Sequence, residues 1–518
     1  MFLIQSDLIS YHDINNTLTI IFKETILPNL LIDAGPGCGK THTLADAYIY
    51  AKSANTSIFK SRFNATDEQI VIYDWVRRYF PQKCTTACYM AYNADIVADS
   101  KVKIHPDCEI KTIHGWGATV LKNSQGYLGK PIHDRGEKLV QEIEGKAFSE
   151  LKDKFDWLST IRFVDKLREE LLPITEESMQ YLQSKYADLA PFKIHPNIVA
   201  QSNKLITKMK TIDRKIGIGY LDQVWLACFL IKKPLYQFGF VDEAQDLSPL
   251  LLLLVSKLCE NIVYCGDKNQ AINAWKGADS EAMDKVAAEC DEILTLKTSF
   301  RLPPNHARTA NEIRPTAMIK SLPEKKDGIQ ATIDTEDIIT WSNEVLTKKP
   351  MIVCRYNAPL VQLGLMYIKA GIPCKLLGQS ELDNLVNTVN NRRATSIRDL
   401  HQKLDVYENM ILNKGDDLAK EQNSRKMDAI RHILKSCQTV EEFEPLLKRL
   451  SNPPKTTDFI TLSTVHKAKG REAKVIGILN PPIPSSKARS SSQKEQEANT
   501  DFVAHTRTMQ DQYYIYTR

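Results

Sequence analysis

The stretch "LLIDAGPGCGKTHTLADA", residues 30–47, decides how the rest of the chain is interpreted. A run of apolar residues ends at a glycine-rich turn, and Gly39, Lys40 and Thr41 then open a pattern typical of a helix. A strand, a glycine-rich loop and a helix in this order form a P-loop, in which small residues let backbone N–H groups point at phosphate oxygens. The stretch predicts a nucleotide site; a turn that merely caps a helix is the alternative.

Within the loop, Lys40 is expected to reach the β- and γ-phosphates, and the Thr41 hydroxyl is expected to coordinate Mg²⁺. The residues expected to contact the nucleotide are Ala34, Gly35, Pro36, Gly37, Cys38, Gly39, Lys40, Thr41 and His42. The loop alone leaves open whether the bound phosphate is transferred to a substrate, switches a conformation or drives a motor.

A second motif, "GFVDEAQDLSP" at residues 239–249, places two carboxylates at the end of another apolar run. Asp242 is suited to hold Mg²⁺ through a water molecule, and Glu243 is suited to orient and deprotonate an attacking water. A solvated surface pair is the alternative, but this pair ends an apolar strand in a chain with a P-loop. A small-molecule kinase must exclude water and needs no base for it, so the adjacent acids favour hydrolysis.

A third motif, "VYCGDKNQAINAWKGA" at residues 263–278, follows a further apolar run. Gln270 is expected to contact the γ-phosphate and to respond to its loss. Trp275 is expected to stack on a nucleobase, an interaction typically worth ~1–3 kcal/mol and tolerant of sequence. A core aromatic is the alternative for Trp275.

The whole chain has 518 residues, which suggests two to four domains of ordinary size. Its hydrophobic content of 43% and charged content of 25% are typical of a globular protein. A net charge of +5 excludes a polybasic nucleic-acid coat but is compatible with a local basic groove. The 11 cysteines are an odd number and are predicted to be reduced thiols. With no secretory signal or membrane span recognised, the protein is expected to be cytoplasmic, or nuclear in a eukaryote.

Short apolar runs alternate with helical patterns, which predicts an α/β fold with parallel sheets flanked by helices. The expected strands are 30–34, 87–92, 238–242, 262–266, 351–355 and 475–479. Two charged stretches without strand signals, at about 121–215 and 396–455, are expected to be helical insertions.

Taken together, the motifs resemble those of the UvrD/PcrA/Rep-like superfamily 1A DNA helicases, with "DEAQD" and "GDKNQAINAWKGA" as the most specific match. The remaining motifs, in family order, are "ACYMAYNADIVADS" (87–100), "IKTIHGWG" (110–117), "LKTSFRLP" (296–303), "MIVCRYNAPL" (351–360), "ITLSTVHKAKGREAKVI" (460–476) and "NTDFVAHTRTMQD" (499–511). The aromatic–Asn pair in the first of these and "TIHGWG" are similar to short members such as phage helicases and the F-box DNA helicase.

The resemblance implies two RecA-like P-loop NTPase domains, 1A and 2A, each carrying a helical insertion. The implied segments are 1–120 and 216–303 for domain 1A, 121–215 for insertion 1B, 304–395 and 456–518 for domain 2A, and 396–455 for insertion 2B.

The resemblance also implies ATP and Mg²⁺ as cofactors and assigns roles by position. Phe300 would stack on adenine, Glu472 would contact the ribose, Arg301 would contact the γ-phosphate, and Arg507 would reach the same phosphate from the second core domain. The implied catalytic set is Lys40, Asp242, Glu243, Gln270, Arg301 and Arg507. The implied single-strand track consists of Tyr92, Asn93, His114, Trp116, Trp275, Lys276, Arg355, Asn357, Thr464 and His466.

The function implied is an ATP-dependent helicase moving 3′→5′ on single-stranded DNA or a 3′-tailed duplex. Two alternatives stay open: a DNA-stimulated ATPase that remodels or senses protein–DNA complexes without processive unwinding, and a nucleotide-gated subunit that works with a repair, replication or defence protein. RNA is also open as the substrate, because stacking tracks do not inherently report the 2′-hydroxyl.

Overall fold

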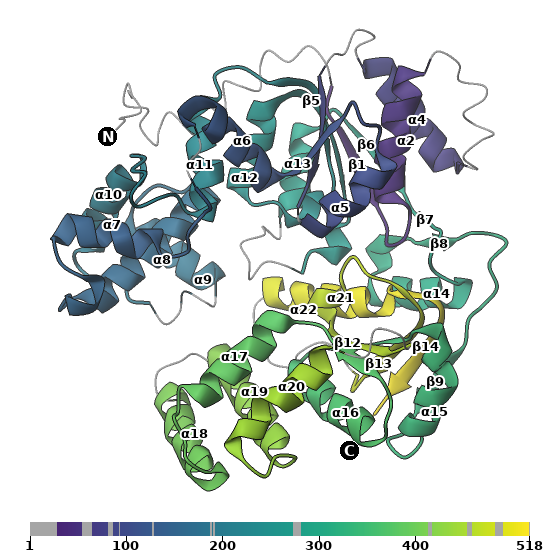
Figure 1. The fold of residues 1–518 in the computed structure, drawn as a ribbon. Helices are drawn as coiled ribbons and strands as arrows, with labels where there is room; N and C mark the ends of the chain where they lie inside the picture. The colour runs from purple at the N-terminus through teal and green to yellow at the C-terminus, as the bar shows by residue number, and fades with distance from the viewer. Residues whose placement is uncertain are drawn as a thin grey trace. The chain divides into compact units, whose positions relative to one another are not determined.

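The computed structural model describes residues 28–53, 65–80, 86–92, 94–126, 129–186, 189, 192–272, 281–412, 417–452, 458–481 and 491–516. The chain forms two compact units (Figure 1). Unit 1 comprises Met1–Ala34 and Gly39–Leu296, and unit 2 comprises Gly35–Cys38 and Lys297–Arg518. No helix of the described residues is long and apolar enough to span a membrane.

Unit 1 is built on a six-stranded sheet with the order β3-β2-β4-β5-β1-β6, in which every neighbouring pair is parallel. Its strands are β1 (Leu30–Ala34), β2 (Ala87–Ala91), β3 (Glu109–Thr112), β4 (Tyr236–Val241), β5 (Cys259–Gly266) and β6 (Glu292–Leu296). The inner strands are apolar runs buried along almost their whole length, as expected for a parallel sheet covered on both faces. The prediction of an α/β fold with parallel sheets is confirmed.

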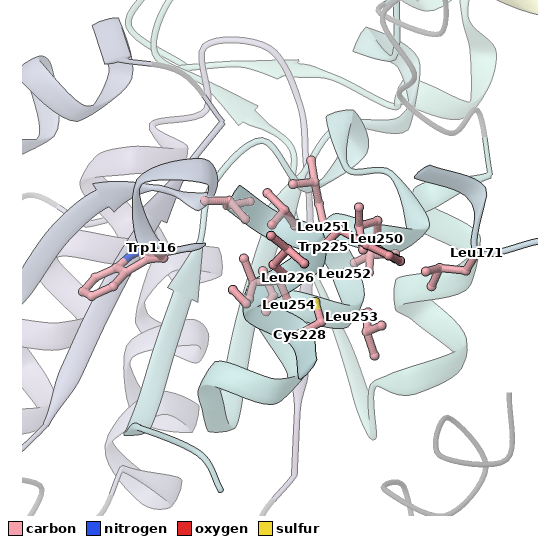
Figure 2. Packing of buried hydrophobic residues seen from close by; sticks show 14 of the residues in the cluster. Trp116, Leu171, Trp225, Leu226, Cys228, Leu250, Leu251, Leu252, Leu253 and Leu254 are labelled. Atoms are coloured by element: carbon pink, nitrogen blue, oxygen red, sulfur yellow. The ribbon is translucent and has the colours of Figure 1, made fainter. Parts of the chain in front are cut away.

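Helices pack on both faces of this sheet (Figure 1). They are α2 (Lys40–Lys52), α4 (Asp67–Tyr79), α5 (Ala94–Lys103), α6 (Ile113–Gln125), α11 (Tyr220–Leu230), α12 (Pro249–Leu258) and α13 (Ala282–Glu289). Helix α12 begins after Ser248, whose hydroxyl caps the first turn, and its five consecutive leucines are all buried. Figure 2 shows these leucines packed with Trp225, Leu226 and Cys228 of α11.

In the described residues of the predicted insertion at 121–215, the main elements are helices, namely α7 (Arg135–Glu144), α8 (Lys154–Glu170), α9 (Glu176–Lys185) and α10 (Ile198–Met209), and Ile132 forms an isolated β-bridge. A buried ionic cluster joins it to the sheet-bearing part. Asp222 at the start of α11 pairs with Arg135 at 2.8 Å and with Arg168 at 2.6 Å. Burial alone would raise the pKa of Asp222, but the two guanidinium charges lower it below its ordinary value.

Unit 2 contains a second six-stranded parallel sheet, with the order β11-β12-β10-β13-β14-β9. Its strands are β9 (Gln330–Ile333), β10 (Met351–Cys354), β11 (Cys374–Leu376), β12 (Ile460–Thr464), β13 (Ala473–Leu479) and β14 (Thr508–Ile515). The short strands β7 (Thr298–Ser299) and β8 (Lys320–Ser321) form a separate pair. All six strands predicted from the sequence therefore exist, four in unit 1 and two in unit 2.

The helices against the second sheet are α14 (Pro304–Ile313), α15 (Ile338–Val345), α16 (Asn357–Lys369), α21 (Val465–Ala468) and α22 (Ser491–His505). The stretch predicted as a helical insertion, 396–455, contains α18 (Ile397–Leu412), α19 (Asp417–Leu434) and α20 (Phe443–Ser451), and α17 (Gln379–Asn390) precedes it. These helices share one hydrophobic core with the sheet of unit 2.

Candidate nucleotide site and nucleic-acid track

The P-loop lies between β1, which ends at Ala34, and α2, which begins at Lys40. Gly37 and Gly39 both have a positive φ, of 69° and 77°, a conformation that glycine adopts without steric cost. A Cβ atom at Gly37 would lie only 2.4 Å from the Cβ of Arg301. The loop conformation therefore requires glycine at this position.

The apex of the loop is held by the segment that contains Arg301. The backbone N–H of Phe300 donates to the Gly37 carbonyl at 2.9 Å, and the Ser299 hydroxyl donates to the Pro36 carbonyl at 2.8 Å. These bonds place the predicted adenine-stacking and γ-phosphate residues beside Pro36 and Gly37, which belong to the same unit. The side chain of Phe300 is 37% exposed.

Asp242 follows the last residue of β4, and the structure brings it to the first turn of α2. Its Oδ2 atom accepts a hydrogen bond from the Thr41 hydroxyl at 2.6 Å and another from the Tyr89 hydroxyl at 2.6 Å. Its Oδ1 atom accepts from the backbone N–H of Glu243 at 2.9 Å. Burial raises the pKa of the Asp242 carboxyl, and the negative charge of Glu243 acts in the same direction.

Glu243 has a φ of 57°, a left-handed conformation uncommon for a residue other than glycine. Its Oε1 atom lies 3.9 Å from the Lys40 ammonium, and its Oε2 atom accepts a hydrogen bond from the Gln245 side chain. Burial alone would lower the pKa of Lys40, but the surrounding carboxylates, Glu243 foremost, raise it above its ordinary value. The lysine therefore stays charged at the mouth of the P-loop.

The residues that follow β5 pack next to Glu243 and Gln245. Gln270 donates to Asp267 Oδ2 at 2.6 Å, and Asp267 in turn donates its backbone N–H to Gln245 Oε1 at 2.9 Å. The Gln245 amide thus bridges Glu243 and the β5 loop, and it is fully buried. Gln245 stands within the quoted "DEAQD" motif, and Tyr89 within "ACYMAYN", but sequence reasoning gave neither a role.

The predicted arginines of unit 2 meet at the end of α22. Arg301 pairs through Nε with Glu472 Oε2 at 2.6 Å and donates through Nη1 to the Thr506 carbonyl at 3.1 Å. Arg507, only 1% exposed, donates through Nε to the Val503 carbonyl at 2.9 Å and through Nη2 to the Thr506 hydroxyl at 2.9 Å. Both guanidinium groups are therefore fixed around Thr506.

Four predicted track residues come together at the carboxyl ends of two adjacent strands. Cys354, the last residue of β10, is opposite Thr464, the last residue of β12. Arg355 therefore lies next to Thr464, and Asn357 and His466 follow in the first turns of α16 and α21.

The track residues predicted in unit 1 differ in how deeply they are buried, and some lie outside the described residues. Tyr92 is half-buried, and burial together with the nearby charges of Asp246 and Glu169 raises its pKa. Burial lowers the pKa of His114. Asn93, Trp275 and Lys276 lie outside the described residues.

The prediction that Trp116 lines the track is wrong. Its side chain is only 1% exposed and belongs to the hydrophobic core of unit 1. The ring packs edge-on against Tyr236 at 5.0 Å, and the Lys111 ammonium lies 4.2 Å from its centre. Figure 2 includes Trp116 among the buried residues. A base cannot stack on a ring whose surface is already covered by protein.

Comparison with known protein families identifies the family to which these motifs belong. A family model described as the UvrD/REP helicase N-terminal domain matches residues 21–291, more than half of the 518 residues. The chain belongs to the UvrD/REP helicase family. A comparison with curated proteins gave no match.

Membership of the UvrD/REP helicase family implies an ATP-hydrolysing helicase that acts on DNA and uses a divalent metal ion. The matched region includes the P-loop, the Asp242–Glu243 pair and Gln270, and it ends before Arg301. The two parallel sheets flanked by helices agree with the RecA-like domains of this family.

Proposed function

We propose that the protein is an ATP-dependent motor that moves along single-stranded DNA and separates strands, with the 3′→5′ polarity that the family resemblance implies. The observation that carries this proposal is the convergence of Lys40, Thr41, Asp242 and Glu243 at the mouth of the P-loop. A phosphate-binding loop next to a carboxylate base is the equipment of a nucleotide hydrolase.

The donor set at this position fits Mg²⁺. Hydroxyl and carboxylate oxygens are the ligands that this ion prefers, and the Thr41 hydroxyl already lies 2.6 Å from Asp242 Oδ2. When bound, Mg²⁺ neutralises charge on the β- and γ-phosphate oxygens. We assign Thr41 and Asp242 as the residues that hold it, and Lys40 as the phosphate-binding cation.

Glu243 is proposed to orient and deprotonate the attacking water. Two contacts support this role. Gln245 holds one of its carboxylate oxygens, and Lys40 faces the other at 3.9 Å, so the side chain is fixed beside the phosphate-binding lysine. Gln270 is proposed to sense the γ-phosphate, and its side chain is held close to this cluster by its bond to Asp267. Arg301 and Arg507 are proposed to contact the γ-phosphate by resemblance.

The nucleic-acid track is proposed to run over the ends of β10 and β12, where Arg355, Asn357, Thr464 and His466 gather. A guanidinium suits bidentate phosphate contacts, and the polar side chains around it offer hydrogen bonds to the backbone. Phosphate contacts of this kind carry no sequence information, which suits a motor that must step along any sequence.

The decisive experiment measures ATP turnover with and without single-stranded DNA. Lys40→Ala and Glu243→Gln are each expected to abolish DNA-stimulated hydrolysis, while Glu243→Gln still binds ATP. Glu260→Gln, at an exposed position of β5, is the matched control and is expected to leave turnover unchanged. Wild-type turnover in both site variants would overturn the proposal.

Strand displacement on 3′-tailed and 5′-tailed duplexes then tests the motor. Displacement of the 3′-tailed duplex only is expected. ATP turnover stimulated by DNA without displacement of either duplex would favour a remodelling or sensing ATPase instead. Turnover that depends on an added protein would favour the nucleotide-gated subunit.

A further inference from the structure

We propose that Tyr89 is a positioning residue, which fixes the Asp242 carboxylate in the orientation that binds the metal ion of the nucleotide. This inference rests on the proposed function, in which Asp242 is a metal ligand. Tyr89 is the third residue of β2. It lies opposite Phe240 of β4, and Phe240 precedes Asp242 by two residues in the chain. Its side chain is 1% exposed, and its hydroxyl lies 2.6 Å from Asp242 Oδ2.

The hydrogen bonds around Asp242 give Tyr89 a role that its neighbours cannot take. The carboxylate accepts three described bonds, from the Thr41 hydroxyl, the Tyr89 hydroxyl and the Glu243 backbone N–H. Thr41 is itself proposed to bind the metal ion, so its hydroxyl is not a constant partner of Asp242. The Glu243 N–H is local and reaches only Oδ1. Tyr89 is therefore the donor to Oδ2 that is not itself a proposed ligand of the metal ion.

Fixing Oδ2 matters because the outer torsion of an aspartate side chain has a broad energy minimum. A carboxylate on its own can rotate away from a ligand position at little cost. A tyrosine ring packed inside a parallel sheet has almost no such freedom, so its hydroxyl is a rigid point of attachment. Partners that orient metal ligands in this way typically change metal affinity by about 10–100-fold when removed.

The test separates positioning from simple packing. Tyr89→Phe removes one oxygen atom and leaves the ring in place, while Asp242 keeps its bonds from Thr41 and Glu243. Tyr264→Phe is the matched control, because Tyr264 is also 1% exposed, also lies in this sheet on β5, and its hydroxyl has no hydrogen-bond partner among the described residues.

Binding of Mn²⁺ to the full chain is measured by electron paramagnetic resonance in the presence of ADP, so that no hydrolysis is needed. Tyr89→Phe is expected to weaken Mn²⁺ binding about 10-fold, with metal-free ADP affinity and melting temperature close to wild type. Tyr264→Phe is expected to bind Mn²⁺ as wild type does. Incorporation of 3-fluorotyrosine at position 89, which restores the hydroxyl donor, is expected to restore binding.

Asp242→Asn distinguishes failure of this inference from failure of the proposed function. If Asp242→Asn loses Mn²⁺ binding while Tyr89→Phe stays within twofold of wild type, Tyr89 has no positioning role and the metal site stands. If Asp242→Asn also binds Mn²⁺ as wild type does, the metal site itself is misplaced, and both the assignment of Asp242 and the inference on Tyr89 fall.

Discussion

Removing the charge of Glu497 should make the protein bind single-stranded DNA more tightly. Glu497 lies on α22 and pairs with Arg355, the guanidinium proposed to contact the nucleic-acid backbone. The pair is bidentate, with Nε–Oε2 and Nη2–Oε1 distances of 3.1 Å and 2.5 Å, and the two side chains are 22% and 13% exposed. A phosphate that binds Arg355 in the same two-pronged geometry must displace this carboxylate.

The size of the effect follows from what Glu497→Gln leaves in place. The amide oxygen can still accept one hydrogen bond from the Arg355 guanidinium, but the attraction between opposite charges and the second parallel bond are lost. The ionic attraction of a pair that is partly exposed to solvent contributes up to about 1 kcal/mol, so the competing contact weakens by roughly that amount. The affinity for single-stranded DNA is therefore expected to rise about fivefold.

The assay is fluorescence anisotropy with a labelled oligo-dT strand, titrated at several salt concentrations without nucleotide. Glu495→Gln is the matched control, because this substitution removes the same charge from the same helix. Glu495 pairs with Arg314 at 3.2 Å and not with Arg355. An equal gain in both variants would trace the effect to net charge alone. Binding by Glu497→Gln that is no tighter than wild type would refute the competition between carboxylate and phosphate.

Three further perturbations test other parts of the structure. Gln245→Leu removes the amide that holds the Glu243 carboxylate. In a turnover assay kcat is expected to fall about 10-fold or more, while ATP affinity stays within twofold of wild type. An unchanged kcat would contradict this expectation. Arg168→Met removes one of the two guanidinium groups that compensate the buried charge of Asp222. The free energy of unfolding, measured with urea, should fall by about 3 kcal/mol, and a fall below 1 kcal/mol would contradict this expectation. Burial raises the pKa of Asp46 to about 6, so protonation favours the folded state and stability falls as pH rises from about 4 to 6. The melting-temperature advantage of Asp46→Asn over wild type should therefore grow across that range, and a constant difference would count against it.

The strands predicted from the sequence are inner strands whose side chains are mostly buried, although the equally buried inner strand β12 was not predicted. Those that sequence reasoning did not predict include the four edge strands, β3 and β6 in unit 1 and β9 and β11 in unit 2. An edge strand is short and partly exposed, and segments such as "EIKT" and "CKL" contain no apolar run that could stand out.

Strand β14 went unpredicted for a different reason. It is an inner strand of the second sheet but contains the buried polar residues Asp511 and Gln512. Asp511 is satisfied by Lys348 at 3.1 Å and by the Ile329 N–H at 3.1 Å, both more than 160 residues away in the chain. Burial of a polar strand depends on such distant partners, which a local pattern does not contain.

In the candidate site, too, some features follow from local sequence patterns and others depend on residues that are distant in the chain. The P-loop and the Asp242–Glu243 pair are short local patterns and could be found from residue types alone. The bond between Tyr89 and Asp242 depends on β2 and β4 being neighbours in register, which only the assembled sheet provides. Trp116 was misassigned because an aromatic residue near basic and polar residues has the same local pattern whether its ring is buried or exposed.

Helix α22 offers a route by which DNA binding could change ATP hydrolysis. Glu497 near the middle of this helix pairs with Arg355. Thr506, directly after the helix ends, accepts from Arg301 through its carbonyl and from Arg507 through its hydroxyl. At 1.5 Å per residue these two points are about 13 Å apart on one rigid element. A phosphate that displaces Glu497 therefore removes a contact that holds the middle of the helix, and the end of the same helix fixes both arginines. Glu497→Gln should mimic that release, raising ATP turnover without DNA and shrinking the stimulation by DNA. If turnover without DNA stays at the wild-type level although DNA affinity has risen, Glu497 only competes for Arg355, and the coupling must run through other residues.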